Sequence, residues 1–215
     1  MKASHVLSAS ALLIAASTPA FAESEGGFDR HVKPSSGIEL AVAAGYAQGG
    51  GDIGRDMAAL DDVAGPGGAV ELQVGYRIIP HLTLGVYGSL SAFDQGDALA
   101  DDTRVTGATA GVQGIWHFRP SSSVAPWVSL GTGWKGLWLS PDTGKTASLQ
   151  GLELARLQVG VDYRLSPSVA ITPLVGGGLS MFLAQDSAMT SDYDEINDKE
   201  VSFSLFAGLA GRFNL

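Results

Sequence analysis

The sequence predicts an all-β fold, an eight-stranded antiparallel up-and-down transmembrane β-barrel. Three observations lead to this prediction. Apolar and polar residues alternate with a period of two in eight successive segments, as they do in strands with one apolar face. The connections between the segments are short and long in turn, which is typical of membrane barrels. Many of the chain's 29 glycines lie on the polar faces of these segments, as expected where a narrow interior leaves little room for side chains.

The composition argues against several other classes of protein. Hydrophobic residues make up 45% of the 215 residues and charged residues 16%, so the chain is too apolar to be disordered. The lack of cysteine excludes disulfide scaffolds, thiolate zinc sites and cysteine nucleophiles. A formal net charge of −9 opposes nucleic-acid binding, which needs a basic surface. The mean hydropathy of +0.17 is high for a soluble domain, yet no stretch after residue 22 reads as a membrane helix.

Residues 1–22 are predicted to be a secretory signal peptide. Lys2 supplies the basic start, an apolar stretch follows, and Ala20-Phe21-Ala22 forms a small-x-small cleavage site. The polar residues 23–36 are predicted to be a short periplasmic lead-in. The barrel is then expected to occupy residues 37–215.

Each predicted strand carries its apolar residues on one face. In the first four strands this face consists of Ile38, Leu40, Val42, Ala44 and Tyr46; of Val70, Leu72, Val74, Tyr76 and Ile78; of Leu82, Leu84, Val86 and Leu90; and of Ala108, Ala110, Val112, Trp116 and Phe118. In the last four it consists of Val128, Leu130, Thr132 and Trp134; of Leu157, Val159, Val161, Tyr163 and Leu165; of Val169, Ile171, Val175, Leu179 and Met181; and of Val201, Phe203, Leu205, Leu209, Phe213 and Leu215.

The connections between these strands divide into two classes. The short turns are residues 79–81, 119–123 and 166–168, and the long polar connections are residues 49–68, 91–104, 140–150 and 184–200. Short turns at one end and long loops at the other match barrels with short periplasmic turns and longer extracellular loops.

Two segments depart from regular alternation. Pro173 lies on the apolar face of the seventh strand, where it removes a ladder hydrogen bond, so we expect a bulge or a shorter paired segment there. Leu152 and Leu154 are out of phase with Leu157, which predicts a bulge or a loop boundary near Ala155.

Glycines and aromatic residues indicate which face meets lipid. The polar faces hold Gly45, Gly75, Gly85, Gly111, Gly131, Gly133, Gly160, Gly176, Gly178 and Gly208. Glycine weakens a strand and packs nothing, so a solvated exterior has no use for it, whereas a narrow interior does. Aromatic residues gather at both ends of the apolar faces, as in the girdles of membrane barrels. The predicted girdles are Tyr76, Trp116, Phe118, Tyr163 and Phe213 near the short turns, and Tyr46, Trp134 and Phe203 near the long loops.

Three stretches resemble the OmpA/OmpX type of small outer-membrane barrel, namely Val74–Pro80, Pro126–Trp134 and Phe206–Leu215. The resemblance covers nearly all of the mature chain. It implies a bacterial outer-membrane location with extracellular long loops, and contact with outer-membrane lipid and lipopolysaccharide. It also implies insertion by the barrel-insertion machinery, which in this family reads the last strand. Here that strand ends in Leu215, with Phe213 on the same face.

Charged side chains on the polar faces are predicted to line the barrel interior. They are Glu39, Glu71, Arg77, Lys135, Arg156, Asp162, Arg164 and Arg212, accompanied by Gln73, Gln113, Gln158 and His117. An unpaired charge in a narrow interior costs several kcal/mol, so we expect a salt-bridged and hydrogen-bonded plug. The alternative is a gated or narrow ion path through the same residues.

The long connections carry most of the acidic residues, which suggests a surface that interacts with other molecules. An extracellular protein, a glycan or a divalent cation are the partners left open. No metal site and no cofactor is predicted. The closest approach to a calcium site is Asp192, Asp194, Glu195 and Asp198, which lack the glycine and terminal glutamate spacing of an EF-hand.

Enzyme activity is not predicted. Barrels that modify lipid A need a histidine with a serine or carboxylate partner near the outer leaflet, whereas His31, His81 and His117 all map to the periplasmic side. The sequence therefore predicts a non-enzymatic barrel with a structural, adhesive or surface-interaction role in its acidic loops. The alternative is a small OmpW-like channel or transport barrel for ions or small apolar molecules.

Overall fold

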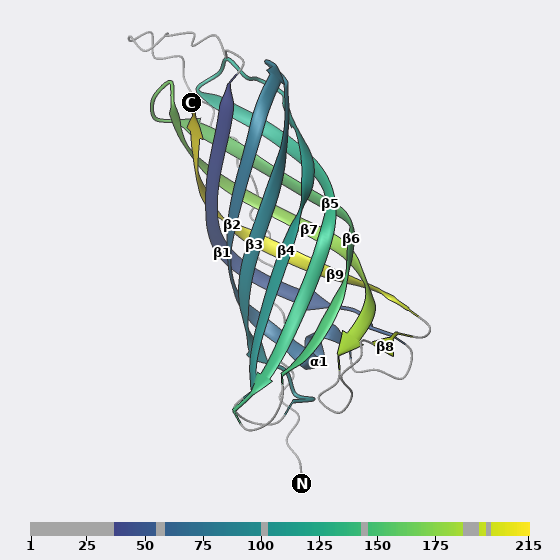
Figure 1. Ribbon diagram of the computed structural model, residues 1–215. Helices are drawn as coiled ribbons and strands as arrows, with labels where there is room; N and C mark the ends of the chain where they lie inside the picture. Colours follow the sequence, from purple (N-terminus) through teal and green to yellow (C-terminus); the bar gives the residue numbers. More distant parts are fainter. Residues whose placement is uncertain (1–36, 55–58, 100–102, 143–145, 187–193, 197–198) are drawn as a thin grey trace. The chain divides into compact units, whose positions relative to one another are not determined.

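The computed structural model describes residues 37–215, apart from 55–58, 100–102, 143–145, 187–193 and 197–198. Eight long strands form a barrel (Figure 1). They are β1 (Ile38–Gly50), β2 (Ala64–Ile79), β3 (Leu82–Gln95), β4 (Thr103–His117), β5 (Val124–Pro141), β6 (Ala147–Arg164), β7 (Val169–Asp186) and β9 (Val201–Asn214). The minor elements are the helical turn α1 (Leu60–Val63) and the two-residue strand β8 (Asp194–Glu195). The predicted signal peptide and lead-in lie outside the described residues.

Antiparallel pairing of chain neighbours closes the barrel. Each long strand pairs with the next one along the chain, and β9 pairs with both β7 and β1. The predicted eight-stranded antiparallel up-and-down barrel is therefore confirmed. Closure gives every long strand a hydrogen-bonded neighbour on both sides, which is how a β-sheet satisfies its backbone groups in lipid. Among the described residues, no helix is long and apolar enough to cross a membrane.

The strands are longer than the alternation predicts, and the predicted bounds of the long connections are therefore wrong. β5, β6 and β7 each have 18 residues, against the roughly 10 that an apolar band requires. The connection from β1 to β2 shrinks to residues 51–63, and the one from β5 to β6 to residues 142–146. Beyond an apolar band the outward face has no need of apolar residues, so alternation fades while backbone pairing continues. The predicted short turns are confirmed.

The structure resolves both irregular segments. The pairing of β6 with β7 shifts in register between Glu153 and Ala155, so the bulge expected near Ala155 is confirmed. It turns Leu152 and Leu154 to the outside. At Pro173 there is no bulge in the β7 register. The pairing with β6 is instead interrupted between Gly160 and Tyr163 and resumes in the same register, which is the shorter paired segment.

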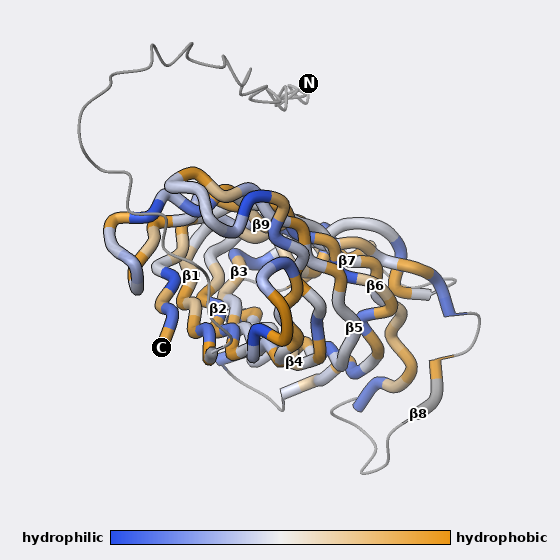
Figure 2. The backbone as a smooth tube through the Cα atoms, turned by 90° about the horizontal axis from the view of Figure 1, so that it is seen from above, coloured by the Kyte–Doolittle hydropathy of each residue, from blue (hydrophilic) through white to orange (hydrophobic). Residues whose placement is uncertain are grey.

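The barrel is apolar outside and polar inside. Leu90, Leu130 and Leu209 are each more than 60% exposed on the outer face, and Figure 2 shows hydrophobic and hydrophilic residues alternating along the strands. All eight aromatic residues of the predicted girdles lie on the outer face and are at least 36% exposed. An apolar patch this extensive is stable in lipid rather than in water.

Paired glycines on the inner face allow neighbouring strands to approach closely. Gly75 lies opposite Gly85, Gly111 opposite Gly133, and Gly45 opposite Gly208. A methyl group on Gly133 would overlap the Ala110 carbonyl oxygen and lie 2.7 Å from Gly111 Cα. The curvature of the wall at these pairs therefore requires glycine.

Alanine substitutions at two glycines of neighbouring strands test this requirement. We expect Gly133→Ala to destabilise the folded barrel by roughly 1–3 kcal/mol, because the added methyl group overpacks the inner wall. Gly114→Ala is the matched control, since its methyl group would meet only Leu84 Cδ2, at 3.4 Å, and should change stability by less than about 0.5 kcal/mol. Urea unfolding in detergent micelles, followed by tryptophan fluorescence, measures both. Equal midpoints for the two variants would contradict the steric argument.

Candidate functional site

A set of buried polar side chains, here called the turn-end cluster, fills the barrel near the short turns. Its members are Glu39, Arg77, Thr83, His117, Trp127, Asp162, Thr172 and Arg212. Arg77 forms an ion pair with Glu39, and Thr83 Oγ1 donates a hydrogen bond to Glu39 Oε2 at 2.5 Å. His117 Nε2 lies 3.6 Å from the same carboxylate oxygen. The Glu39 carboxylate therefore has partners from three other strands, β2, β3 and β4.

Asp162 is the second carboxylate of the turn-end cluster. It accepts hydrogen bonds from Trp127 Nε1 at 2.9 Å and Thr172 Oγ1 at 2.7 Å. Arg212 Nε lies 3.3 Å from Asp162 Oδ1, and the Arg212 guanidinium stacks 4.7 Å above the Trp127 ring. The N–H geometry of this Nε is too poor for a hydrogen bond, so the Arg212–Asp162 contact is electrostatic. Each buried charge has an opposite charge beside it, which limits the cost of its desolvation.

A second group of residues, the mid-lumen cluster, crosses the centre of the barrel. It consists of Glu71, Gln73, Tyr87, Glu153, Arg156 and Gln158. Arg156 forms an ion pair with Glu71 and lies 4.0 Å from Glu153 Oε2. Gln73 and Gln158 both donate to Glu71, at 2.6 Å and 3.3 Å. These contacts bring β2 and β6 together across the lumen.

Tyr87 links the mid-lumen cluster to β3. Its hydroxyl donates to Glu153 Oε2 at 2.5 Å, and its ring lies 4.4 Å from the guanidinium carbon of Arg156. Arg156 thus has two carboxylates and an aromatic face as partners. Glu71 accepts hydrogen bonds from Gln73, Arg156 and Gln158, whereas Glu153 accepts one from Tyr87 and faces Arg156 at 4.0 Å. The centre of the barrel is consequently occupied by a dense charged network rather than by an open path.

The charged residues predicted to face the lumen do not all join these clusters. Glu39, Arg77, Asp162 and Arg212 lie in the turn-end cluster, and Glu71 and Arg156 in the mid-lumen cluster. Lys135 lies in the lumen near Glu153 of the mid-lumen cluster, and the half-buried Arg164 at the end of β6 lies near Asp162 of the turn-end cluster. Among the described residues, neither forms a direct ion pair with a cluster carboxylate.

Sequence reasoning missed Glu153, which is 2% exposed and central to the mid-lumen cluster. Counting by twos from Arg156 places Glu153 on the outer face, and only the bulge at Leu154 turns it inward. Two apolar residues out of phase, Leu152 and Leu154, were the available signal. If both face lipid, the residue between them must face the lumen.

An apolar cluster, here called the apolar plug, lies at the long-loop end of the lumen, where the acidic composition of the loops concealed it. Its buried residues are Ile53, Leu60, Val63, Ala64, Val105, Leu137, Leu149, Phe182 and Ile196. Single apolar residues of the loops pack onto inward-facing residues of the strands, and Leu60 N–H donates to Gly51 O at 2.8 Å. The described loop residues Ile53, Leu60 and Ile196 are therefore packed at the barrel mouth and are not solvated.

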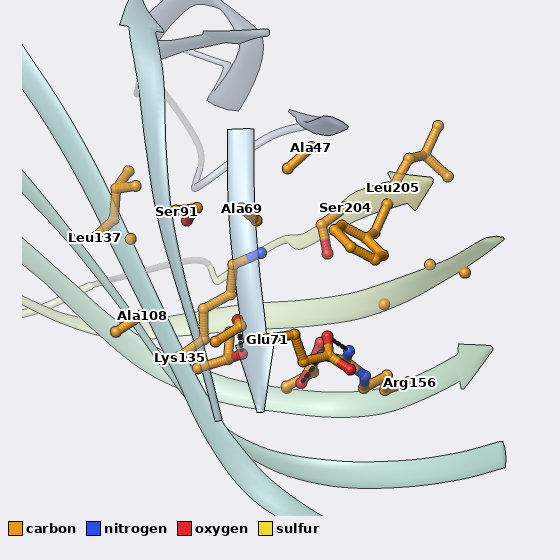
Figure 3. A pocket seen from close by; sticks show the side chains of 18 of the residues that line it. Ala47, Ala69, Glu71, Ser91, Ala108, Lys135, Leu137, Arg156, Ser204 and Leu205 are labelled. Carbon is orange, nitrogen blue, oxygen red and sulfur yellow. Dashed lines mark hydrogen bonds and ion pairs between the residues drawn. The ribbon is translucent and has the colours of Figure 1, made fainter. Parts of the chain in front are cut away.

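A chamber of about 80 Å³ lies inside the barrel and is lined by residues of all eight long strands. Figure 3 shows Glu71, Lys135 and Arg156 among its lining residues. Glycines and small side chains, including Ala47, Ala69 and Gly107, create the space.

Exposed carboxylates surround the apolar plug and form what is here called the acidic rim. Its members are Asp52, Asp61, Asp62, Asp94, Asp97 and Asp142. Of the residues nearest to a calcium motif, Asp194 and Glu195 form β8, whereas Asp192 and Asp198 lie outside the described residues. Within the described ranges, no group of three or more His, Asp or Glu side chains could hold a metal ion.

The two histidines that the structure describes have packing roles near the short turns. His117 is completely buried beneath Glu39, and His81 Nδ1 lies 2.8 Å from the His117 carbonyl oxygen, to which it donates. The His81 ring also stacks on Trp116, with ring centroids 5.6 Å apart. His31 lies outside the described residues.

Known structures share this fold. No protein-family model and no curated protein sequence matches the chain. The crystal structure of Neisserial surface protein A is similar, with a TM-score of 0.57 and 16% identity over 85% of this chain and 100% of that one. The solid-state NMR structure of outer membrane protein AlkL in DMPC lipid bilayers has a TM-score of 0.53 and 13% identity over 89% of this chain and 97% of that one. Identities this low show the fold alone, and the fold is a transmembrane β-barrel.

Two substitutions in the lumen compare the stability contribution of a buried charge that has a partner with that of a buried amide whose polar atoms lack hydrogen bonds among the described residues. We expect Glu71→Gln to lower the free energy of unfolding by about 3 kcal/mol, because it removes the main counter-charge of the buried Arg156. Gln113 is 5% exposed and its side-chain amide has no hydrogen-bond partner among the described residues. We expect Gln113→Met to leave stability unchanged or to raise it by up to about 1 kcal/mol. Urea unfolding in micelles measures both, and a loss in Gln113→Met equal to that in Glu71→Gln would refute the distinction.

Proposed function

We propose that this protein is a closed, non-enzymatic barrel of the bacterial outer membrane whose work is done at its extracellular acidic rim. In this proposal the chain is exported, loses its signal peptide near Ala22, and is inserted as a barrel of the OmpA/OmpX type. The single observation that carries the proposal is the filled lumen. The role is then structural or adhesive and belongs to the outer surface.

Three successive layers support a closed lumen. The turn-end cluster occupies one end, the mid-lumen cluster the centre, and the apolar plug the other end. Conduction would require ion pairs such as Arg156–Glu71 to separate, and separating a buried pair costs several kcal/mol. In addition, the interior of an eight-stranded barrel is just wide enough for side chains to fill it.

The acidic rim supports a surface role. Its six aspartates are all exposed, and Arg104 is an exposed basic residue at the same end. Carboxylates this dense create a negative potential that attracts cations and basic surfaces over about 8 Å at physiological salt. The partners that fit are an extracellular protein with a basic patch, a divalent cation, or a glycan that such a cation bridges.

The positions of the histidines support a non-enzymatic role. His81 and His117 lie at the short-turn end, and His117 is fully enclosed by protein. Neither reaches the rim, where a lipid-modifying site would have to be.

A small OmpW-like channel or transport barrel is the second candidate, and the chamber favours it. The chamber is lined by all eight strands, so it is a widening of the lumen itself. Transport from there would require the apolar plug or the charged clusters to move aside.

Conductance separates the two candidates. We expect the folded protein in a planar bilayer to show no steady openings, because ion pairs and packed apolar side chains block its lumen at three levels. Heat-modifiable gel migration confirms folding before the measurement, and a known porin serves as the conducting control. Steady openings that Gly131→Trp abolishes would establish the channel instead.

Charge removal tests the proposed surface role. We expect cells that display a variant with Asp61, Asp62, Asp94 and Asp97 changed to Asn to adhere at least about threefold less to a surface coated with a basic protein at low salt, since the rim loses most of its potential. Salt should reduce adhesion of the unaltered barrel in the same direction. Equal adhesion of both forms at equal display would exclude the acidic rim as the binding surface.

A further inference from the structure

The chamber contains a partly buried cation that forms no direct ion pair with the carboxylates of the described residues. Lys135 extends from β5 into the chamber (Figure 3). Its ammonium group lies 3.3 Å from Ser180 Oγ and 5.9 Å from the centroid of the Phe182 ring. Among the described residues, no carboxylate oxygen lies within 4.0 Å of Nζ.

The two carboxylates of the chamber are engaged elsewhere. Glu71 binds Arg156 and two glutamines, and Glu153 accepts from Tyr87 and faces Arg156. Turning either carboxylate toward Lys135 would break contacts that hold the mid-lumen cluster together. Glu153 acts on Lys135 only at longer range, with its oxygens more than 4.0 Å from Nζ. The direct hydrogen-bond partner of the ammonium group is a neutral hydroxyl, which leaves its other N–H groups to bind an anion in the chamber.

The rest of the chamber wall is suited to a small amphipathic molecule. Ser91 and Ser204 contribute hydroxyl groups, whereas Phe93, Leu137 and Phe206 contribute apolar surface. A water molecule needs about 10–15 Å³ of such space, so the chamber of about 80 Å³ offers room for roughly five or more non-hydrogen atoms. A short-chain carboxylate has this size and both kinds of surface.

We propose that the chamber is a binding site for a short-chain carboxylate, with Lys135 as its counter-ion. The carboxylate oxygens accept hydrogen bonds from Lys135 Nζ and a chamber hydroxyl, and the alkyl tail packs against the apolar wall. The apolar tail distinguishes this ligand from chloride, and the charge distinguishes it from a neutral alcohol. The site is compatible with a closed barrel, because a chamber inside the lumen exchanges ligand through transient opening and requires no open pore.

Equilibrium dialysis of the folded barrel in detergent micelles tests the site, with radiolabelled propionate as the probe. Dialysis to constant counts allows for slow exchange, and empty micelles give the background. We expect saturable binding of one propionate per barrel that excess unlabelled propionate displaces and that equal concentrations of chloride or 1-propanol do not. Absence of saturable binding to the unaltered barrel, or equal displacement by chloride, would overturn the proposal.

Two variants that each lose one positive charge locate the site. We expect Lys135→Met to weaken propionate binding at least tenfold, and Arg104→Met, which alters an exposed residue outside the chamber wall, to leave it unchanged. Heat-modifiable migration verifies that each variant is folded. If Lys135→Met does not fold, Ala69→Leu serves instead, since it fills the chamber while retaining the lysine and should also abolish binding. Unchanged binding in a folded Lys135→Met or Ala69→Leu variant would place propionate elsewhere and refute the site.

Discussion

The narrow interior of an eight-stranded barrel constrains every inward-facing residue of this protein. Where neighbouring strands approach most closely on the inner face, as at Gly111 and Gly133, only glycine fits. Where charged side chains point inward, confinement separates them from bulk water, so each must find a partner within reach. Arg77 and Arg156 satisfy this condition with carboxylates from other strands. Wall curvature, charge pairing and the filling of the lumen therefore all follow from the same lack of space.

The ion pairs of the lumen contribute more to specifying the strand register than to the free energy of unfolding. Replacing a buried ion pair by apolar residues is often neutral or stabilising, whereas removing one partner is costly. Pairs such as Arg156–Glu71, between residues 85 positions apart, link strands that are not neighbours in the wall. A shift of β6 by one residue would turn Arg156 toward lipid and leave Glu71 in the lumen without its counter-charge. The charged clusters thereby help to specify the register of the wall.

The outer and inner faces of the barrel are suited to different interactions. The outer wall exposes apolar and aromatic residues along its strands, as lipid contact requires. The charged groups described above lie in the lumen and at the acidic rim. The lumen is filled at three levels but retains a chamber beside Lys135, so a closed barrel can still bind a small molecule. A surface role and an internal site are thus compatible in one fold, because the apolar plug separates the rim from the chamber.

Alternation of period two was enough to predict the barrel, its eight strands and the side on which each residue of a regular strand lies, because it is a local property that lipid and a narrow lumen impose on every strand. It also showed that Glu39, Glu71, Arg77, Arg156, Asp162 and Arg212 share the lumen. It did not reveal which charges pair, because partners such as Arg156 and Glu71 meet only through strand tilt and register. Nor did it show that Glu153 faces inward, that Lys135 stands apart from the ion pairs, or that Ile53, Leu60 and Ile196 converge in a plug. These points become visible in the folded barrel, since a bulge, a cross-lumen contact and the packing of loops depend on residues that are distant in the chain.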